Sequence, residues 1–326
     1  MKKNLILLIA IILLNALATL DVFAVFYARC ISPLFVQTIG RLTGLFPISL
    51  FEWVVVFMGI GVIFIIIKYR SWTLFFRYLL VICLIFTLTT GMNYHRQPIE
   101  KDLKFTKVNY TTEELKQLCQ YVTNQLYILD TEAMDQKAMA KQSRIAMNQV
   151  IPGYYPIPKP MLFSKLMTAC GLSGIFSPFT IEANYNKDMT AFNIPFTMCH
   201  ELSHLQGYMS EDEANFLAYL ACTQSDQAYF RYSAYLTAFI YMTNELYDLG
   251  VDIEPYYAQL SAPIINDLKE DHAFWNQYGD TISTIANTVN DTYLKMNSIE
   301  DGVVSYQRFV GLIYSYYKQN NASIFS

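Results

Sequence analysis

The residues His200-Glu201-Leu202-Ser203-His204 form an H-E-x-x-H sequence, a pattern that can support catalysis. We expect it to lie within a helix, where two histidines four residues apart share one face and reach one zinc ion. Glu201 lies beside them and is the expected general base and acid toward a water molecule activated by the metal. The pattern therefore predicts a zinc-dependent hydrolytic site on His200, Glu201 and His204.

A catalytic zinc site needs a third protein ligand, and acidic residues follow the motif closely. Glu211 is the expected ligand, because Asn215 stands one turn later and can accept the free ring N–H of a zinc histidine. Glu213 is the alternative ligand, although we expect it to close a capping box on Ser210 instead. The predicted metal ligands are thus His200, His204 and Glu211.

Hydrolysis of a peptide bond also calls for a group that steadies the developing oxyanion. We take Tyr306 and Arg308 as candidates for this role; the alternative is a core tyrosine and a surface arginine. His272 is a further candidate; the alternative is that it is a solvent-facing residue on a polar helix. Residues 179–186 are either a strand that pairs with substrate backbone or an ordinary strand with polar side chains.

These residues must be positioned by a mostly helical region that spans residues 92–326. Thr111 and Glu114 form a capping-box signature at the start of one helix. Mixed β-branched and aromatic residues predict one or two short strands within residues 174–186. The predicted fold is mainly α with a small β element, as in a zincin-like domain. The expected helices cover about residues 111–127, 130–149, 193–207, 226–249, 262–277, 281–297 and 305–319, and a further helix begins at Ser210.

Residues 1–91 are nearly uncharged and predict a membrane anchor with three transmembrane helices, at about residues 4–28, 46–67 and 72–90. The first segment also has features of a cleavable signal peptide, but its apolar sequence continues past the small-residue triplet, which favours an uncleaved anchor. Lysines and arginines cluster at the ends that would face the cytoplasm, so we expect the C-terminal domain to be extracytoplasmic. The expected location is a multi-pass position in the cell membrane.

The composition excludes some functions. The chain has 326 residues and is 53% hydrophobic and 15% charged, whereas a soluble domain has about 25% charged residues. Its net charge is −4 and it has no basic cluster beyond the short runs beside the apolar segments, so we expect no nucleic-acid partner. The six cysteines form no CxxC pair and are expected to be buried hydrophobic residues. The expected partners are the lipid bilayer and a polypeptide substrate that is membrane-proximal or part of the cell envelope.

Around the motif the sequence resembles the glutamate-zincins, in which the second motif reads E-x-x-A-D. Here Glu211 and Ala214 match, Asn215 replaces the aspartate, and the spacing from His204 is much shorter than in those peptidases. The resemblance implies a Zn²⁺ metallopeptidase of the HExxH type. The replacement at position 215 favours an alternative, a non-catalytic zincin-like membrane receptor or assembly factor; the retained Glu201 opposes it.

Over nearly its whole length the chain more closely resembles an uncharacterised bacterial membrane protein family, known as domain of unknown function 3810. This resemblance implies a membrane-tethered, peptidase-like protein and no particular substrate. The stretches that carry it are residues 46–52, 91–94, 177–184, 195–204, 211–216 and 305–308.

Overall fold

The computed structural model describes residues 2–129, 132–277 and 305–325 of the chain. These residues are mostly helical, with one small three-stranded sheet, which confirms the predicted mainly α fold with a β element. The helix predicted over about residues 281–297 lies outside the described residues.

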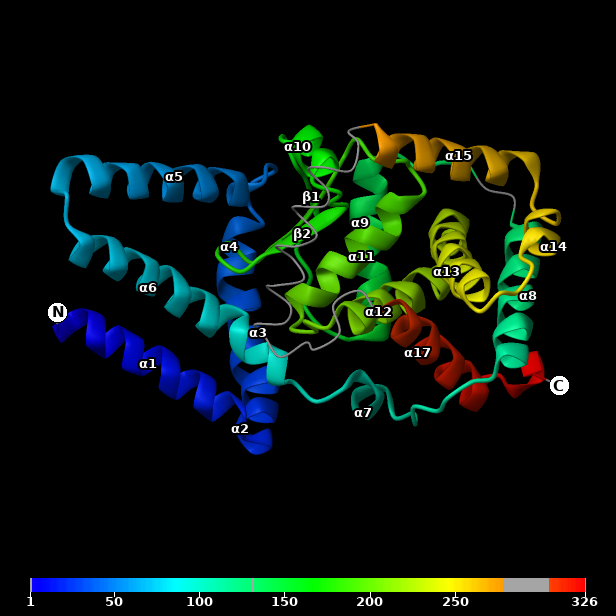
Figure 1. The fold of residues 1–326 in the computed structure, drawn as a ribbon, viewed down its shortest axis with the longest axis horizontal. Coiled ribbons are helices and arrows are strands. Elements are labelled where there is room, and N and C mark those ends of the chain that lie inside the picture. The colour runs from blue at the N-terminus through cyan, green and yellow to red at the C-terminus, as the bar shows by residue number, and fades with distance from the viewer. Residues whose placement is uncertain (1, 130–131, 278–304, 326) are drawn as a thin grey trace.

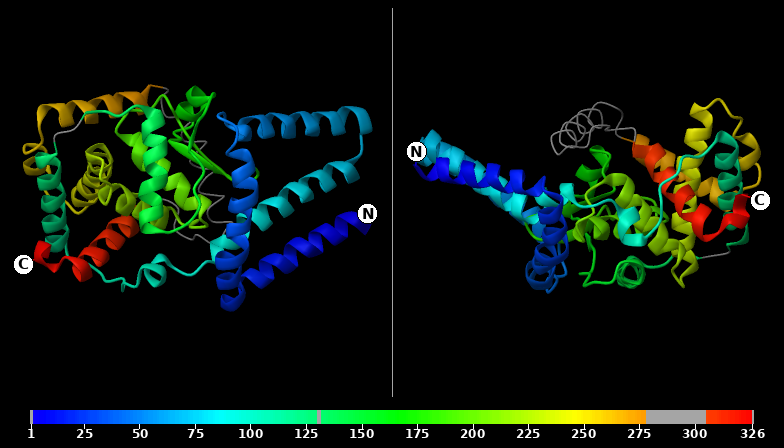
Figure 2. Two further views of the ribbon diagram at one scale, coloured as in Figure 1. Left: turned by 180° about the vertical axis from the view of Figure 1, so that it is seen from behind. Right: turned by 90° about the horizontal axis from the view of Figure 1, so that it is seen from below.

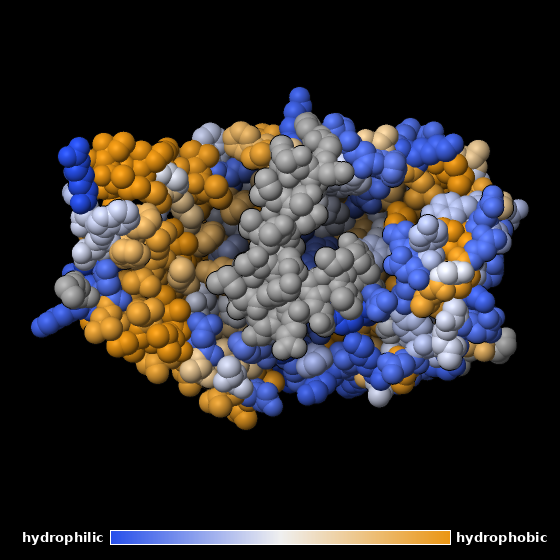
Figure 3. Space-filling model, viewed as in Figure 1, coloured by the Kyte–Doolittle hydropathy of each residue, from blue (hydrophilic) through white to orange (hydrophobic). Residues whose placement is uncertain are grey.

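Three helices are long and apolar enough to cross a membrane: Asp21–Thr43, Leu50–Tyr69 and Trp72–Thr89. The last two contain α5 (Leu50–Phe64) and α6 (Trp72–Thr89) and match the second and third predicted segments. Helix α1 (Lys2–Ala18) lies alongside α6 (Figure 1), and their N-terminal ends are joined where Asn4 donates to the Thr73 carbonyl at 3.0 Å. Apolar residues dominate the surface at this end of the molecule (Figure 3), as expected of a membrane protein.

The first predicted apolar segment, residues 4–28, is wrong as a single helix. Helix α1 ends at Ala18, Leu20 is extended, and a new helix begins at Asp21. An aspartate is favourable in the first turn of a helix because its charge interacts with the positive end of the helix dipole. We call the continuous helix Asp21–Thr43 the transverse helix, since it runs across the ends of α1, α5 and α6 (Figures 1 and 2).

The transverse helix consists of successive α- and π-helical turns and lies between α1 and α5 in the chain. It packs the anchor against the rest of the structure. Its last turn packs on the sheet region: Thr43 donates to the Thr180 carbonyl at 2.9 Å, and Gly40 lies against Ile181. Its segments are α2 (Asp21–Phe26), η1 (Tyr27–Ile31), α3 (Ser32–Phe35), η2 (Val36–Gly40) and α4 (Arg41–Thr43).

The rest of the chain is a helical domain with one large hydrophobic core, contributed mainly by α8, α9, α11, α12, α13 and α17. The predicted capping box is confirmed: Thr111 and Glu114 bond reciprocally at the start of α8. The tyrosines of α12 and α13, such as Tyr219 and Tyr235, are buried in this core. The elements are η3 (Ile65–Tyr69), η4 (Gly91–His95), α7 (Ile99–Leu103), α8 (Thr112–Ile128), α9 (Gln136–Val150), α10 (Ser164–Ala169), α11 (Asn193–Leu205), α12 (Glu211–Thr223), α13 (Ala228–Asp248), α14 (Glu254–Tyr257), α15 (Ala262–Asn276), α17 (Ser305–Asn320) and η6 (Ala322–Phe325).

The sheet has the strand order β1-β3-β2, with β1 (Lys159–Pro160) parallel and β2 (Gly174–Ser177) antiparallel to β3 (Glu182–Tyr185). Strands β2 and β3 confirm the predicted strands in residues 174–186. The short strand β1 was not predicted, because its sequence lies in a proline-rich stretch that disfavours regular structure. Strand β3 is buried at every position, and α11 packs against both β2 and β3.

Buried carboxylates hold the anchor to the sheet. Glu182 on β3 accepts backbone N–H bonds from Leu50 and Phe51, both at 3.0 Å, and so satisfies the start of α5. It also forms a buried ion pair with Lys159 of β1. Glu52 of α5 is also buried and accepts the backbone N–H groups of Leu162 and Phe163, the two residues that precede α10.

Candidate metal centre

Three side chains from two helices converge at the centre of the domain. His200 and His204 lie one turn apart on α11, and Glu211 is the first residue of α12. The two Nε2 atoms are 3.0 Å apart, and the Glu211 carboxylate lies 3.2 Å from Nε2 of His200 and 3.6 Å from Nε2 of His204. Ligands about 2.0–2.1 Å from a tetrahedral zinc ion lie about 3.3–3.4 Å from each other. The spacing of the three groups therefore fits one metal ion.

The hydrogen bonds of the two imidazoles determine which ring nitrogens face the centre as lone pairs. Nδ1 of His204 lies 2.7 Å from the Tyr208 carbonyl, which can only accept, so this nitrogen carries the proton. Nδ1 of His200 lies 2.8 Å from Oδ1 of Asn215 and donates in the same way. In the neutral rings both Nε2 atoms then present lone pairs to each other and to the Glu211 carboxylate. Such a cluster is stable only with a cation, either a proton or a metal ion, among the three groups.

The pKa shifts of His204 and Glu211 also indicate that a positive charge is favourable among the three groups. Burial alone would lower the pKa of His204, but the Glu211 carboxylate overrides it and raises that pKa to about 9. Burial would likewise raise the pKa of Glu211, but the two histidines lower it well below its ordinary value. The side chains are only 11% exposed at His204 and 15% at His200, so water screens these charges little.

Glu201 lies beneath β2 rather than in solvent. Burial raises its pKa to about 6, while the neighbouring histidines oppose the rise, and the backbone N–H of Phe176 donates to its carboxylate. A Cβ atom at Gly174 would lie only 2.4 Å from Oε1 of Glu201, so only glycine leaves room for this side chain against the strand. A carboxylate with a pKa near neutrality beside the metal ligands suits a general base.

The turn between α11 and α12 sets the distance from His204 to Glu211. It is held by Arg96, which donates to the Gln206 carbonyl and to the Tyr208 hydroxyl, both at 2.9 Å. The same guanidinium stacks 3.8 Å above the Tyr208 ring and pairs with Asp102 at 3.0 Å. Because the Tyr208 carbonyl receives the His204 N–H, this network orients a candidate metal ligand.

A second contact shapes the same turn. Gly207 has a positive φ of 89°, and a Cβ atom there would come within 3.1 Å of three atoms of Asn93. Asn93 in turn donates to the Ser32 hydroxyl of the transverse helix at 3.0 Å. The geometry of the candidate centre is therefore built partly by the segment that follows the last membrane helix.

A family model described as protein of unknown function, DUF3810, matches residues 27–314 of the chain. The chain belongs to this family. The comparisons with curated proteins and with solved structures found no match. The family match covers the anchor from residue 27 onward, both histidines and the acidic helix α12, and it confirms the resemblance to the uncharacterised membrane protein family.

The alternative ligand Glu213 points away from the centre of this DUF3810 protein. Its Oε1 accepts the backbone N–H of Ile99 at 2.8 Å, and burial raises its pKa to about 8. The predicted capping box on Ser210 is wrong: Ser210 precedes α12 but makes no side-chain cap bond, and its hydroxyl donates to Asp212 instead. Of the acidic residues that the structure describes, only Glu211 lies close enough to both histidines to share a metal ion with them.

The residues proposed to steady an oxyanion are only partly placed. Arg308 on α17 lies 3.8 Å from the carboxylate of Asp212, the residue that follows Glu211, so it is near the centre without contacting the histidines in the described interactions. The side chain of Tyr306 lies outside the described part of the structure. His272 is exposed on α15 and contacts Asn276 of its own helix, as the solvent-facing alternative predicts.

The strand expected to pair with substrate backbone, residues 179–186, does not have a free edge. Strand β3 is paired on both sides, by β1 and by β2, so its backbone is already used within the sheet. Glu182 is occupied by the start of α5, and the Asn184 side-chain amide donates within the sheet. The interpretation of this segment as an added-strand partner is therefore wrong, and β2 forms the sheet edge nearest Glu201.

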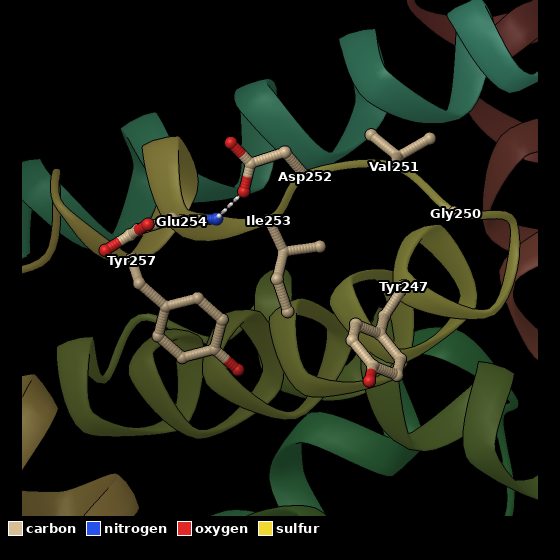
Figure 4. Close-up of a pocket in the computed structure, with 7 residues that line it drawn as sticks. All are labelled: Tyr247, Gly250, Val251, Asp252, Ile253, Glu254 and Tyr257. Atoms are coloured by element: carbon tan, nitrogen blue, oxygen red, sulfur yellow. Dashed lines mark hydrogen bonds between the residues drawn. The ribbon is translucent and has the colours of Figure 1, made fainter.

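A hollow of about 470 Å³ lies elsewhere, at the junction of α13 and α14. Figure 4 shows two aromatic rings and two carboxylates around it, and Asp252 is already engaged as it accepts the N–H of Glu254 at 3.0 Å. Its lining residues include no histidine, cysteine or lysine, so the histidine pair remains the candidate catalytic site. They are Tyr247, Gly250, Val251, Asp252, Ile253, Glu254 and Tyr257.

Sequence reasoning missed Gly174, Arg96 and Tyr208 as parts of the centre. Tyr208 stands four residues after His204, a spacing typical of contacts within a helix, but here its carbonyl reaches back from a turn. Arg96 follows the last apolar segment and belongs to no motif. The signal that could have found it is a lone arginine directly after an apolar segment, where a buried polar contact must balance its charge.

Proposed function

We propose that this chain is a membrane-anchored, zinc-dependent metallopeptidase. The convergence of two imidazole lone pairs and one carboxylate at 3.0–3.6 Å carries the proposal, because it calls for a cation at that point. Two nitrogens and one oxygen are a donor set typical of catalytic zinc, which retains an open fourth position. His200, His204 and Glu211 would hold the ion.

Zinc in such a site supplies Lewis-acid polarisation of a peptide carbonyl and a lowered pKa for water. Asn215 and the Tyr208 carbonyl hold the two histidine rings in the orientation and tautomer that ligation needs. The Glu201 carboxylate accepts the proton of the attacking water, and the resulting carboxylic acid donates it to the leaving amine nitrogen. In the metal-free protein burial raises the pKa of Glu201 to about 6, and the charge of a bound zinc ion would lower it, which keeps the carboxylate ionised and able to accept a proton near neutral pH.

The substrate class follows from location alone. The apolar helices tether the domain to a membrane, so we propose a membrane-proximal or cell-envelope polypeptide. On the charge pattern of the anchor, the domain would lie on the extracytoplasmic side.

The test begins with bound metal in the full chain, purified in detergent and measured by elemental analysis. We expect about one zinc per chain, and loss of that zinc in His200→Ala and in Glu211→Gln. A well-folded wild-type chain that binds no zinc would end the proposal.

Catalysis is tested separately, with a synthetic peptide library read by mass spectrometry. We expect cleavage by the wild-type chain and none by Glu201→Gln, while the zinc content of the two proteins is equal. The amide fits the space over Gly174 because it matches the carboxylate in size. If both proteins bind zinc and neither cleaves any peptide, the chain would instead be a binding protein on the same fold.

A further inference from the structure

One face of the transverse helix exposes apolar side chains to the outside of the molecule. Val22 is 85% exposed, Phe26 51%, Leu34 59% and Leu42 64%. An α-helix turns once in about 3.6 residues, and the π-turns η1 and η2 lengthen this repeat, so side chains spaced four residues apart along the transverse helix stay on one face. We call this face the apolar strip; its members are Val22, Phe26, Cys30, Leu34, Thr38 and Leu42.

Other residues of the transverse helix turn toward the domain. Arg29 pairs with Asp102 at 3.4 Å, and the guanidinium of Arg41 lies 4.5 Å above the ring of Tyr154. The helix is therefore amphipathic: one face makes polar contacts with the domain, and the apolar strip has no protein partner among residues 2–129, 132–277 and 305–325.

The direction of the transverse helix limits what can cover the apolar strip. Helices α5 and α6 form an antiparallel hairpin of membrane-spanning length, and α1 lies beside α6 (Figure 1). Figures 1 and 2 show the transverse helix running across the domain-side ends of these helices. A helix that runs across spanning helices lies in the plane of the membrane, at the depth of their ends.

A second apolar feature lies at the same level. Leu162 and Phe163 are each 55% exposed and Leu166 is 64% exposed, at and before α10. Glu52, in the first turn of α5, accepts the backbone N–H groups of Leu162 at 3.0 Å and Phe163 at 2.7 Å. These bonds hold the α10 tip, residues 162–166, beside the domain-side end of a spanning helix.

We propose that the apolar strip and the α10 tip insert into the interfacial region of a phospholipid bilayer. The transverse helix then lies flat although it is long enough to span, and it seats the domain on the membrane surface. The bilayer is the partner because the apolar strip and the α10 tip are continuous with the apolar surface of α5, through the exposed Leu45, Phe46 and Ile48. This inference does not depend on the proposed metal chemistry.

Site-directed spin labelling of the full chain in phosphatidylcholine–phosphatidylglycerol nanodiscs tests the proposal. Two exposed native cysteines serve as label positions: Cys30 on the apolar strip and Cys83 within α6. Cys30 is labelled in a Cys83→Ser background and Cys83 in a Cys30→Ser background. Both backgrounds also carry Cys170→Ser, because Cys170 is partly exposed. Val22→Cys and Leu42→Cys extend the measurement along the helix. Tyr127→Cys on α8, 76% exposed, gives the aqueous reference.

We expect labels at Val22, Cys30 and Leu42 to lie at one shallow depth, about 5–10 Å into the headgroup–acyl boundary, with Cys83 deeper. A spanning transverse helix would instead show a depth change of about 30 Å from Val22 to Leu42. Either that gradient or water accessibility equal to the Tyr127 reference would overturn the proposal. So would spin–spin coupling at Cys30 that vanishes on dilution with unlabelled chain, because it would identify a second copy as the occupant.

Discussion

The junction between anchor and sheet is built on two buried carboxylates and the candidate metal centre on the partly exposed Glu211, and the two regions differ in what these carboxylates meet. At the junction, Glu52 and Glu182 accept hydrogens from backbone N–H groups, and Glu182 also pairs with a lysine. At the centre, Glu211 meets two imidazole nitrogens that also present lone pairs. The junction is complete within the protein, whereas the centre requires a cation.

This difference separates structural from functional charge within one molecule. A buried carboxylate with its own donors stabilises the fold and has no free capacity for chemistry. A buried group of acceptors without a donor is costly unless a proton or a metal ion joins it.

The largest expected effect is on stability, at the junction. Glu182→Ala leaves Lys159 buried without its partner and leaves the N–H groups of Leu50 and Phe51 unpaired. We expect the free energy of unfolding to fall by about 3–5 kcal/mol, measured by denaturant unfolding in detergent micelles.

The control for this change is Glu211→Gln at the centre, measured in metal-free protein above pH 9, where His204 is neutral and no longer pairs with the carboxylate. It removes one acceptor from a group that has too many, so we expect little loss of stability. A loss equal to that of Glu182→Ala would show that the centre is structural like the junction, and the contrast would fail.

The next effect is on metal affinity, at the place where the two regions meet. Arg96→Ala removes the bonds to the Gln206 carbonyl and the Tyr208 hydroxyl that orient the turn after His204. We expect zinc affinity to fall about 10- to 100-fold, measured by competition with a chelating dye. Arg96→Lys should restore little, since it cannot reproduce the fork of bonds or the stacking on the ring.

Arg29→Ala is the control for that experiment, because Arg29 pairs with the same Asp102 from an exposed position. Its zinc affinity should match that of the wild type. An equal loss in both variants would mean that general electrostatics, rather than the orientation of the turn, controls the metal centre.

The smallest effect is a dependence of stability on pH. Burial favours the neutral form of Asp102, but the charge of Arg96 and hydrogen bonds from Arg96, Gln97 and Tyr208 prevail and lower its pKa below the ordinary 3.8. Its stabilisation is therefore present above pH 3.8 and is lost as the pH falls through the lower, folded-state pKa.

Asp102→Asn lacks this contribution at every pH. In metal-free protein we expect the difference in melting temperature between wild type and Asp102→Asn to be constant near neutrality and to shrink as the pH falls below 3.8. A difference that stays constant into acid would show that the Asp102 carboxylate gains nothing from its charge.

Local patterns in the sequence were sufficient for the features that lie within one helix or strand. The four-residue spacing of His200 and His204 places both on one face of α11, because the helical repeat alone brings them together. The capping box of Thr111 and Glu114 and the apolar lengths of α5 and α6 follow from equally local rules. Family membership also follows from the sequence.

Tertiary structure decided what depends on residues far apart in the chain. The break at Leu20 and the course of the transverse helix follow from packing on the domain, so residues 4–28 could not be divided by hydropathy alone. Glu211, rather than Glu213, faces the histidines because Arg96 and Asn93, more than a hundred residues earlier, shape the turn between the helices. Sequence spacing determines which side chains share a helix face, but only packing between helices determines which faces meet.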